Sequence, residues 1–220
     1  MTTGNTETQS SSHGIRRLAC ATALGLASIV ALPGAARADL TPPAVPGNLK
    51  VDDGHVPFLI LHAFGTQNYV CVTRGAGVGF VLFTPQATLF DENLEEVVHH
   101  FFSPNRDAKD LNSIRVAWQH SHDSSTFWGS VKDFSFDAEF VTPGAIPWLL
   151  VERKGTAAGP AGGDKLTKTT FVQRVNTAGG AAPAEGCSAF ADIGRTQFVP
   201  YQADYVFYRA PTLTGPATRE

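Results

Sequence analysis

The stretch QNYVCVTRGAGVGFVLFT, from Gln67 to Thr84, decides the fold class of this chain. Its first half places Tyr69, Cys71 and Thr73 in alternation with valines. A Gly-Ala-Gly turn follows, and a second run rich in valine and phenylalanine begins after it. Residues of these types favour strands, and glycines permit the tight turn of a hairpin. The sequence therefore predicts a β-hairpin here.

The rest of the chain reads as further strands of the same kind. Its apolar runs are rich in Val, Phe, Tyr, Trp and Thr and are bounded by turn-forming residues. These runs are PFLILHAF, ATLF, SIRVAW, STFWGSVKDFSF, IPWLLVERKG, TTFVQRVNT and ADYVFYR. No segment has apolar residues at helical spacing over three turns. The best candidate for a helix is Asp91 to Phe102, but its second half consists mainly of β-branched and aromatic residues. We expect an all-β fold: a single antiparallel sandwich or partly closed barrel with at most one or two short helices.

The N-terminal segment has the layout of a secretory signal. After a polar extension come two arginines, the apolar run LACATALGLASIVAL, and PGAARA with Ala36 and Ala38 in signal-peptidase spacing. The apolar run is about 15 residues long, short of the roughly 20 that span a bilayer, although a single membrane anchor is the alternative. We predict a signal peptide over residues 1–38, a single β-rich domain over residues 39–220, and a secreted or periplasmic protein.

The charge of the predicted mature chain limits its partners. Beyond residue 38 there remain 14 basic and 19 acidic side chains, with no basic patch. We therefore expect no nucleic-acid partner, and we expect no stable membrane span after cleavage because no second apolar run is long enough. We expect the partner to be a small molecule, a glycan or a surface component.

Two cysteines, Cys71 and Cys187, remain after loss of Cys20 with the signal. An even count in a chain bound for an oxidising compartment predicts a disulfide between them, and two buried free thiols are the alternative. The bridge would close a loop of more than 100 residues. The chain-entropy model gives a stabilisation of up to roughly 5 kcal/mol for a loop of that size.

The loop that Cys187 closes, AGGAAPAEG, consists mainly of small residues. We interpret it as part of the structural scaffold and not as a catalytic centre. Asn176 ends a strand and can adopt left-handed geometry, and Gly179 and Gly180 permit backbone angles that other residues resist. Arg174, on the strand before the loop, is expected to reach either a carboxylate or backbone carbonyls.

Histidines are the candidates for a metal site. His120 and His122 lie two residues apart, so on a strand they would share a face, and His99 or His100 can supply a third ligand from a neighbouring strand. The site prediction is His100, His120 and His122 around a divalent metal. The competing interpretation is that these are surface or hydrogen-bonded histidines.

Other chemistry lacks a complete motif. The glycine spacing in RGAGVGF does not match a dinucleotide fingerprint, and no G-x-S-x-G is present. We predict no organic cofactor, and the sequence assigns no catalytic residue. Trp118, Trp128 and Trp148 can line a sugar or small-molecule cleft or pack in the core. Two functions stay open: a non-catalytic binding or surface-associated domain, which we favour, and a metal-binding protein or metal-dependent enzyme.

Four motifs in order, LHAFGTQNYVC, AIPWLLVE, FVQRVNTAGGAAPAEGC and VPYQADYVFYR, together resemble the secreted family of unknown function DUF3455. The resemblance runs from about Ala44 to Arg209. The strand cysteine and the cysteine after the Asn-Thr-x-Gly-Gly loop recur in that family, which implies the pair Cys71 and Cys187. His100 matches the family's central block, whereas the glycine and tryptophan that follow it in members are absent here. The resemblance implies no established activity.

Overall fold

The computed structural model describes residues 40–104 and 113–211, and this part of the chain is all-β, as predicted. Its elements are η1 (Gly47–Leu49), β1 (Val56–Arg74), β2 (Gly77–Phe90), β3 (Glu96–Pro104), β4 (Ile114–His120), β5 (Thr126–Ser135), β6 (Trp148–Ala157), β7 (Thr169–Gly179), η2 (Phe190–Asp192) and β8 (Thr196–Arg209). The two η elements are single turns of 3-10 helix, and within the described ranges no helix is long and apolar enough to cross a membrane. The predicted signal peptide lies outside the described residues.

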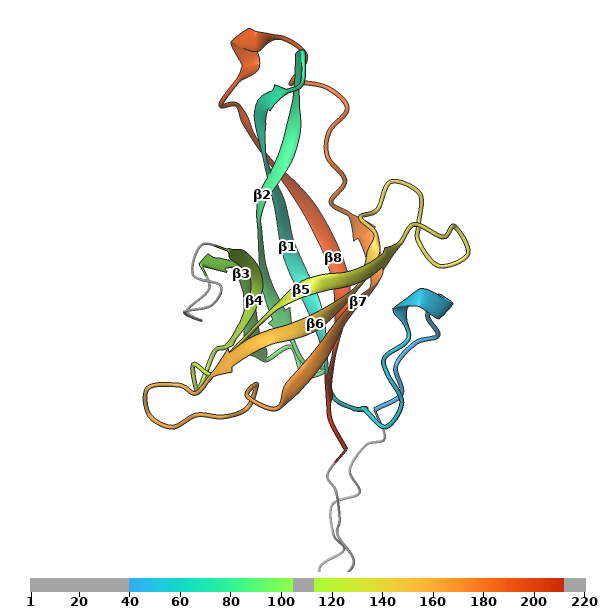
Figure 1. Cartoon of the computed structure of the whole chain (residues 1–220), viewed down its shortest axis with the longest axis vertical. Helices are drawn as coiled ribbons and strands as arrows, with labels where there is room; N and C mark the ends of the chain where they lie inside the picture. The colour runs from blue at the N-terminus through green and yellow to red at the C-terminus, as the bar shows by residue number, and fades with distance from the viewer. Residues whose placement is uncertain (1–39, 105–112, 212–220) are drawn as a thin grey trace, which may run out of the picture. The chain divides into compact units, whose positions relative to one another are not determined.

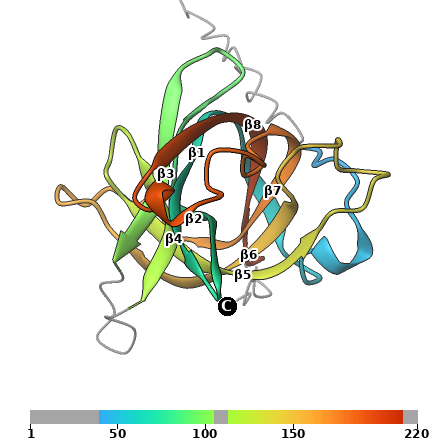
Figure 2. The same ribbon diagram turned by 90° about the horizontal axis from the view of Figure 1, so that it is seen from above.

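The strands form one closed antiparallel barrel in chain order, with β8 pairing back onto β1 (Figures 1 and 2). The prediction of an all-β antiparallel fold is confirmed. The predicted sandwich or partly closed barrel did not specify that the barrel closes completely. Closure follows from the length of β1, which pairs with β2 from His62 to Arg74 and with β8 from Val56 to Val70. A strand with partners along both edges has no free edge over the shared length.

The runs PFLILHAF and QNYVCVTR belong to one strand, β1, although the sequence presents them as two. Gly65 lies at their junction, where a Cβ would come within 2.1 Å of the carbonyl oxygen of Gln86 on β2. A glycine here lets the two strands approach closely without ending either. The predicted Gly-Ala-Gly hairpin is confirmed, with Arg74 opposite Gly77.

The segment considered for a helix, Asp91 to Phe102, forms a turn followed by β3. The Asp91 carboxylate accepts hydrogen bonds from the backbone amides of Asn93 and Glu95, each 2.9 Å long, and Leu94 takes a φ of 62°. An Asx-type turn of this kind reverses the chain within a few residues, so the β-branched half of the segment is free to pair as a strand.

The barrel has two different ends. The β4–β5 turn and the β6–β7 loop lie at the end where β1 begins, which we call the closed end, because fully buried side chains fill the interior there. These side chains are Leu61, Leu89, Val98, Phe127, Leu166, Val172 and Phe207. We call the opposite end, to which the β1–β2 hairpin leads, the open end.

A second apolar layer covers the outside of β6, β7 and β8. Leu49 of η1 is fully buried there against Trp148, Phe171 and Tyr208. The Gln173 amide donates a 2.6 Å hydrogen bond to the carbonyl oxygen of Leu49 and so holds the proline-rich lead on the barrel. Both faces of these strands are therefore buried, which hides the usual alternation of polar and apolar residues.

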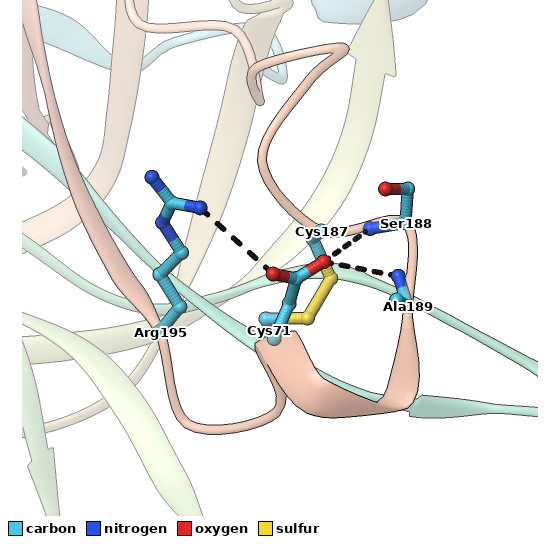
Figure 3. Close-up of a disulfide and its surroundings, with 6 residues drawn as sticks. Cys71, Cys187, Ser188, Ala189 and Arg195 are labelled. Carbon is cyan, nitrogen blue, oxygen red and sulfur yellow. Dashed lines mark hydrogen bonds and ion pairs between the residues drawn. A yellow bond between two sulfur atoms is a disulfide. The ribbon is translucent and has the colours of Figure 1, made fainter.

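Beyond the open end, β1, β2 and the start of β8 continue as a ribbon that carries η2 (Figure 1). A disulfide joins Cys71 on β1 to Cys187 in the loop before β8, with a Cα–Cα distance of 5.6 Å (Figure 3). The Asp192 carboxylate accepts hydrogen bonds of 3.0 Å from the backbone amides of Ser188 and Ala189. The disulfide thus attaches the Cys187 end of the small-residue loop to the ribbon.

Candidate functional site

The candidate site is a cavity of about 260 Å³ in the open half of the barrel. Side chains from all eight strands line it, with help from the segment before β6. Its polar and aromatic lining consists of Gln67, Tyr69, His100, Trp118, Arg174 and Tyr205. Its apolar lining includes Leu82, Pro85, Phe102, Val116, Val131 and Leu149. The interior is therefore packed at the closed end and hollow at the open end.

Arg174 brings the only formal positive charge among the residues that line this cavity. Arg174 is only 7% exposed. Its Nε and Nη2 donate hydrogen bonds of 3.2 and 2.8 Å to the carbonyl oxygen of Pro147. Of the two partners that the sequence left open for Arg174, the structure selects the backbone carbonyl. Within residues 40–104 and 113–211, no carboxylate lies within ion-pair distance of the guanidinium.

Two further donors lie in the cavity wall. The Gln67 Nε2 and the Trp118 Nε1 are both buried, and neither has a hydrogen-bond partner within the described part of the chain. The Gln67 amide is nevertheless close enough to Tyr201 to oppose the rise of that hydroxyl's pKa, which burial drives well above its usual value. Buried donors normally find a partner, so this wall can serve oxygen atoms of a bound molecule.

His100 forms the aromatic part of the wall with Trp118. The two rings stack with centroids 4.4 Å apart, and the His100 Nδ1 donates a 3.0 Å hydrogen bond to the carbonyl oxygen of Ala117. Burial, with a smaller contribution from the charge of Arg174, lowers the pKa of His100 to about 3. The ring is therefore neutral at physiological pH, with its proton on Nδ1.

Tyrosines complete the polar wall. The Tyr205 ring lies 5.1 Å from His100 between centroids, and its hydroxyl is 3.2 Å from that of Tyr201. Burial raises the pKa of Tyr205 and of Tyr69, and the charge of Arg174 opposes the rise in both. All three phenols are thus neutral hydrogen-bonding groups, and none supplies a second charge to the cavity.

The predicted metal ligands are distributed over different places. His100 lines the cavity, whereas His120 lies inside the closed end, where its Nδ1 accepts hydrogen bonds from the amides of His122 and Asp123 at 3.3 and 3.2 Å. The His120 and His122 rings are 5.8 Å apart between centroids. His99 points to the outer face, where its Nε2 is 3.0 Å from Glu96.

Across the described ranges, no group of three or more His, Cys, Asp and Glu side chains is arranged to hold a metal ion. His100 Nδ1 donates to a backbone carbonyl, so its Nε2 carries the free lone pair. The lone pair of His120 Nδ1 already accepts two backbone amides, which places the proton of the neutral ring on Nε2. The divalent metal at His100, His120 and His122 stays a prediction, which elemental analysis of the purified protein tests.

Sequence reasoning missed the cavity and most of its wall. Gln67, Tyr69 and Tyr205 gave no signal, because their strands carry large or apolar residues on both faces. The available signal was Arg174, a charged residue in a strand segment whose apolar residues Val172 and Val175 are buried in the structure. Of the three tryptophans, Trp118 lines the cavity, while Trp148 packs in the outer apolar layer.

Comparison with known proteins places this architecture in a family. The model of the family described as "Protein of unknown function (DUF3455)" matches residues 53–209. Searches of curated proteins and of solved structures give no match. The match includes all eight strands, both cysteines and the polar wall of the cavity, and it confirms the resemblance seen in the sequence. The chain therefore belongs to the DUF3455 family of proteins of unknown function.

Proposed function

We propose that this protein is a secreted, non-catalytic binding protein that holds a small and largely apolar molecule inside its barrel. The observation that carries the proposal is the cavity of about 260 Å³ between the packed closed end and the open end. Small-molecule sites are mostly apolar hollows with a few polar groups, of about 300–1,000 Å³ for drug-sized ligands. A cavity just below that range suits a smaller ligand.

The contrast between the two ends supports a binding site over a packing defect. Protein interiors are close-packed, and the closed end of this barrel obeys that rule, with Leu61, Phe127 and Phe207 completely buried. The open half keeps its hollow although large side chains, such as Trp118 and Tyr205, stand in its wall. Val131, at the rim of the hollow, is 48% exposed, so solvent and ligand can reach the lining.

Binding without catalysis is the simpler reading of the wall chemistry. His100 and the tyrosines are neutral, and His100 Nδ1 is held by a backbone carbonyl. A general base needs a pKa near the working pH, whereas burial moves that of His100 to about 3. These groups can orient a ligand through hydrogen bonds and stacking, which requires no proton transfer.

The test is to fill the cavity from its rim. Val131→Trp places a large side chain at the mouth, and Val56→Trp is the matched control, because Val56 is 40% exposed and does not line the cavity. Binding of a neutral, apolar fluorescent probe, N-phenyl-1-naphthylamine, and of 1-octanol is measured by fluorescence and calorimetry. We expect Val131→Trp to weaken binding strongly and the control to leave it unchanged. Equal binding by both variants would place the ligand elsewhere and refute the proposal.

A further inference from the structure

We infer that the ligand of the barrel is a small monocarboxylic acid, whose carboxylate pairs with Arg174 and whose apolar body extends toward the rim of the cavity. The inference rests on the proposed binding function and adds the chemical class and orientation of the ligand. It is carried by a buried cation that has no anionic partner among the described residues, on the wall of an otherwise neutral hollow.

The guanidinium has donors to spare. An arginine side chain carries five N–H donors. In Arg174, one donor on Nε and one on Nη2 bond the carbonyl oxygen of Pro147, and a further contact runs to the neutral hydroxyl of Tyr205, so donors remain for a ligand. Burying a charge is costly unless it is paired and hydrogen-bonded. A carbonyl oxygen gives Arg174 a dipole but no countercharge, so a negatively charged ligand would complete its surroundings.

The neutrality of the remaining wall limits the ligand to a single negative charge. His100, Tyr69 and Tyr205, the other ionisable groups of the lining, are neutral at physiological pH. A phosphate monoester carries nearly two negative charges and three acceptor oxygens, which exceeds one cation. A carboxylate matches the planar fork of one guanidinium, and the unpartnered Gln67 Nε2 and Trp118 Nε1 are further donors in the same wall.

The apolar part of the lining sets the orientation. Leu82 and Pro85 of β2, Phe102 of β3 and Val131 of β5 lie closer to the open end than Leu89, Val98 and Phe127, the packed closed-end residues of the same strands. Val131 is half-exposed, whereas Arg174 is buried. A ligand that enters from the open end with its carboxylate first would leave its apolar body against these side chains.

The experiment compares acids with their neutral amides on the wild-type protein. Octanoate with octanamide, and 4-phenylbutanoate with 4-phenylbutanamide, are titrated into the full secreted chain by calorimetry near neutral pH, where a carboxylic acid is ionised. Hydrogen bonds to a charged group are worth enough that we expect each acid to bind about 10- to 100-fold more tightly than its amide. The comparison involves no mutation and so does not depend on the folding of a variant.

Variants then assign the preference to Arg174. Arg174→Gln should abolish the preference for acid over amide, and Arg174→Lys should keep part of it, because lysine retains the charge without the fork. Arg153→Gln, on the exposed side of β6, removes the same charge from outside the cavity and should keep the full preference. Thermal melts of each variant show whether it is folded.

The outcomes separate the two proposals. If octanamide and 1-octanol bind, Val131→Trp blocks them, and acids show no advantage, the binding barrel stands and the carboxylate inference is wrong. If the acids bind better than the amides but Arg174→Gln keeps the difference in the folded state, Arg174 is not the recognising group and the inference is also wrong. If no acid binds at all, the inference is refuted.

Discussion

The hydroxyl of Tyr69 donates a 2.6 Å hydrogen bond to the carbonyl oxygen of Gly180, which joins the cavity wall to the loop that Cys187 closes. Gly180 takes a φ of +81°, and a Cβ there would lie 2.8 Å from the Cβ of Tyr201 and 3.2 Å from Gln67. The glycine is therefore required by its backbone angle and by its neighbours. Tyr69 and Cys71, two residues apart on β1, hold the two ends of this loop, Tyr69 from the cavity wall and Cys71 from the ribbon.

Removal of the Tyr69 hydroxyl should destabilise the protein while leaving the barrel intact. In Tyr69→Phe, the buried carbonyl of Gly180 loses its donor, which costs about 1–3 kcal/mol of unfolding free energy. Denaturant melts measure the loss, and the far-ultraviolet circular dichroism of the folded protein should match the wild type. A variant as stable as the wild type would show that water replaces the phenol at no cost.

Substitution of Gly180 should cost more than substitution of a glycine with similar backbone geometry and open space around it. Gly144 has the same φ of +81° with nothing within 4 Å of its ideal Cβ, so Gly144→Ala isolates the backbone strain. Gly180→Ala adds steric contact with the cavity wall, and we expect a loss of about 1 kcal/mol or more beyond the control. Thermal and chemical melts of both variants test this, and equal losses would contradict it.

The disulfide should be present in the exported protein and should stabilise it. Non-reducing peptide mapping should find the peptides of Cys71 and Cys187 linked, and two alkylatable thiols would contradict the bond. Cys71→Ser should lower the unfolding free energy by about 2–5 kcal/mol, as loss of a native bridge usually does. The double variant Cys71→Ser, Cys187→Ser should melt near the single variant, because the second thiol has no partner left.

Acid should destabilise the fold through His100. Its pKa is about 3 in the folded barrel, where it faces Trp118, Tyr205 and the charge of Arg174, against about 6.5 in the unfolded chain. Between these values the unfolded state binds more protons, so the stabilisation is complete above about pH 6.5 and is lost as the pH falls toward 3. Melting temperatures should drop over this range, and His100→Gln should show a shallower drop.

His62 is the control for that pH profile, because its pKa shifts the other way. A hydrogen bond of 2.7 Å to Asp204, with a weaker one to Glu92, raises the pKa of His62 above its usual value. Its contribution is present in full below the unfolded pKa and is lost as the pH rises through the folded one. His62→Gln should therefore leave the acid limb of the profile as steep as in the wild type. An acid limb that flattens in His62→Gln and not in His100→Gln would refute the assignment.

The N-terminus of the exported protein tests the predicted signal peptide. Cleavage after Ala38 should leave a chain that begins at or near Asp39, because Ala36 and Ala38 provide the small residues that signal peptidase selects. N-terminal sequencing of exported material reads this directly. Recovery of the run from Leu18 to Leu32 in a membrane fraction would favour the anchor instead.

The sequence by itself determined the class of structure and several local features. Alternating strand residues and glycine turns predicted the all-β fold and the hairpin after Arg74, and the structure confirms both. Asn176, expected to accept left-handed geometry, has a φ of 49°, and Gly179 and Gly180 are also positive. These properties depend on residues close together in the chain, so local chemistry is enough to predict them.

Only the tertiary structure decided how the barrel closes and what it encloses. Period-two alternation tells which side chains of a strand share a face, but where both faces are buried, as in β8 with Tyr205 inside and Val206 outside, it does not tell which face is the interior. For the same reason, the sequence did not show that His100 and His120, two of the three predicted metal ligands, lie at different depths of the barrel. Arg174 on β7, His100 on β3 and Gln67 on β1 line one cavity although these strands do not pair with one another. Closure of the barrel and the register of all its strand pairs bring the three side chains together, and both are properties of the whole barrel.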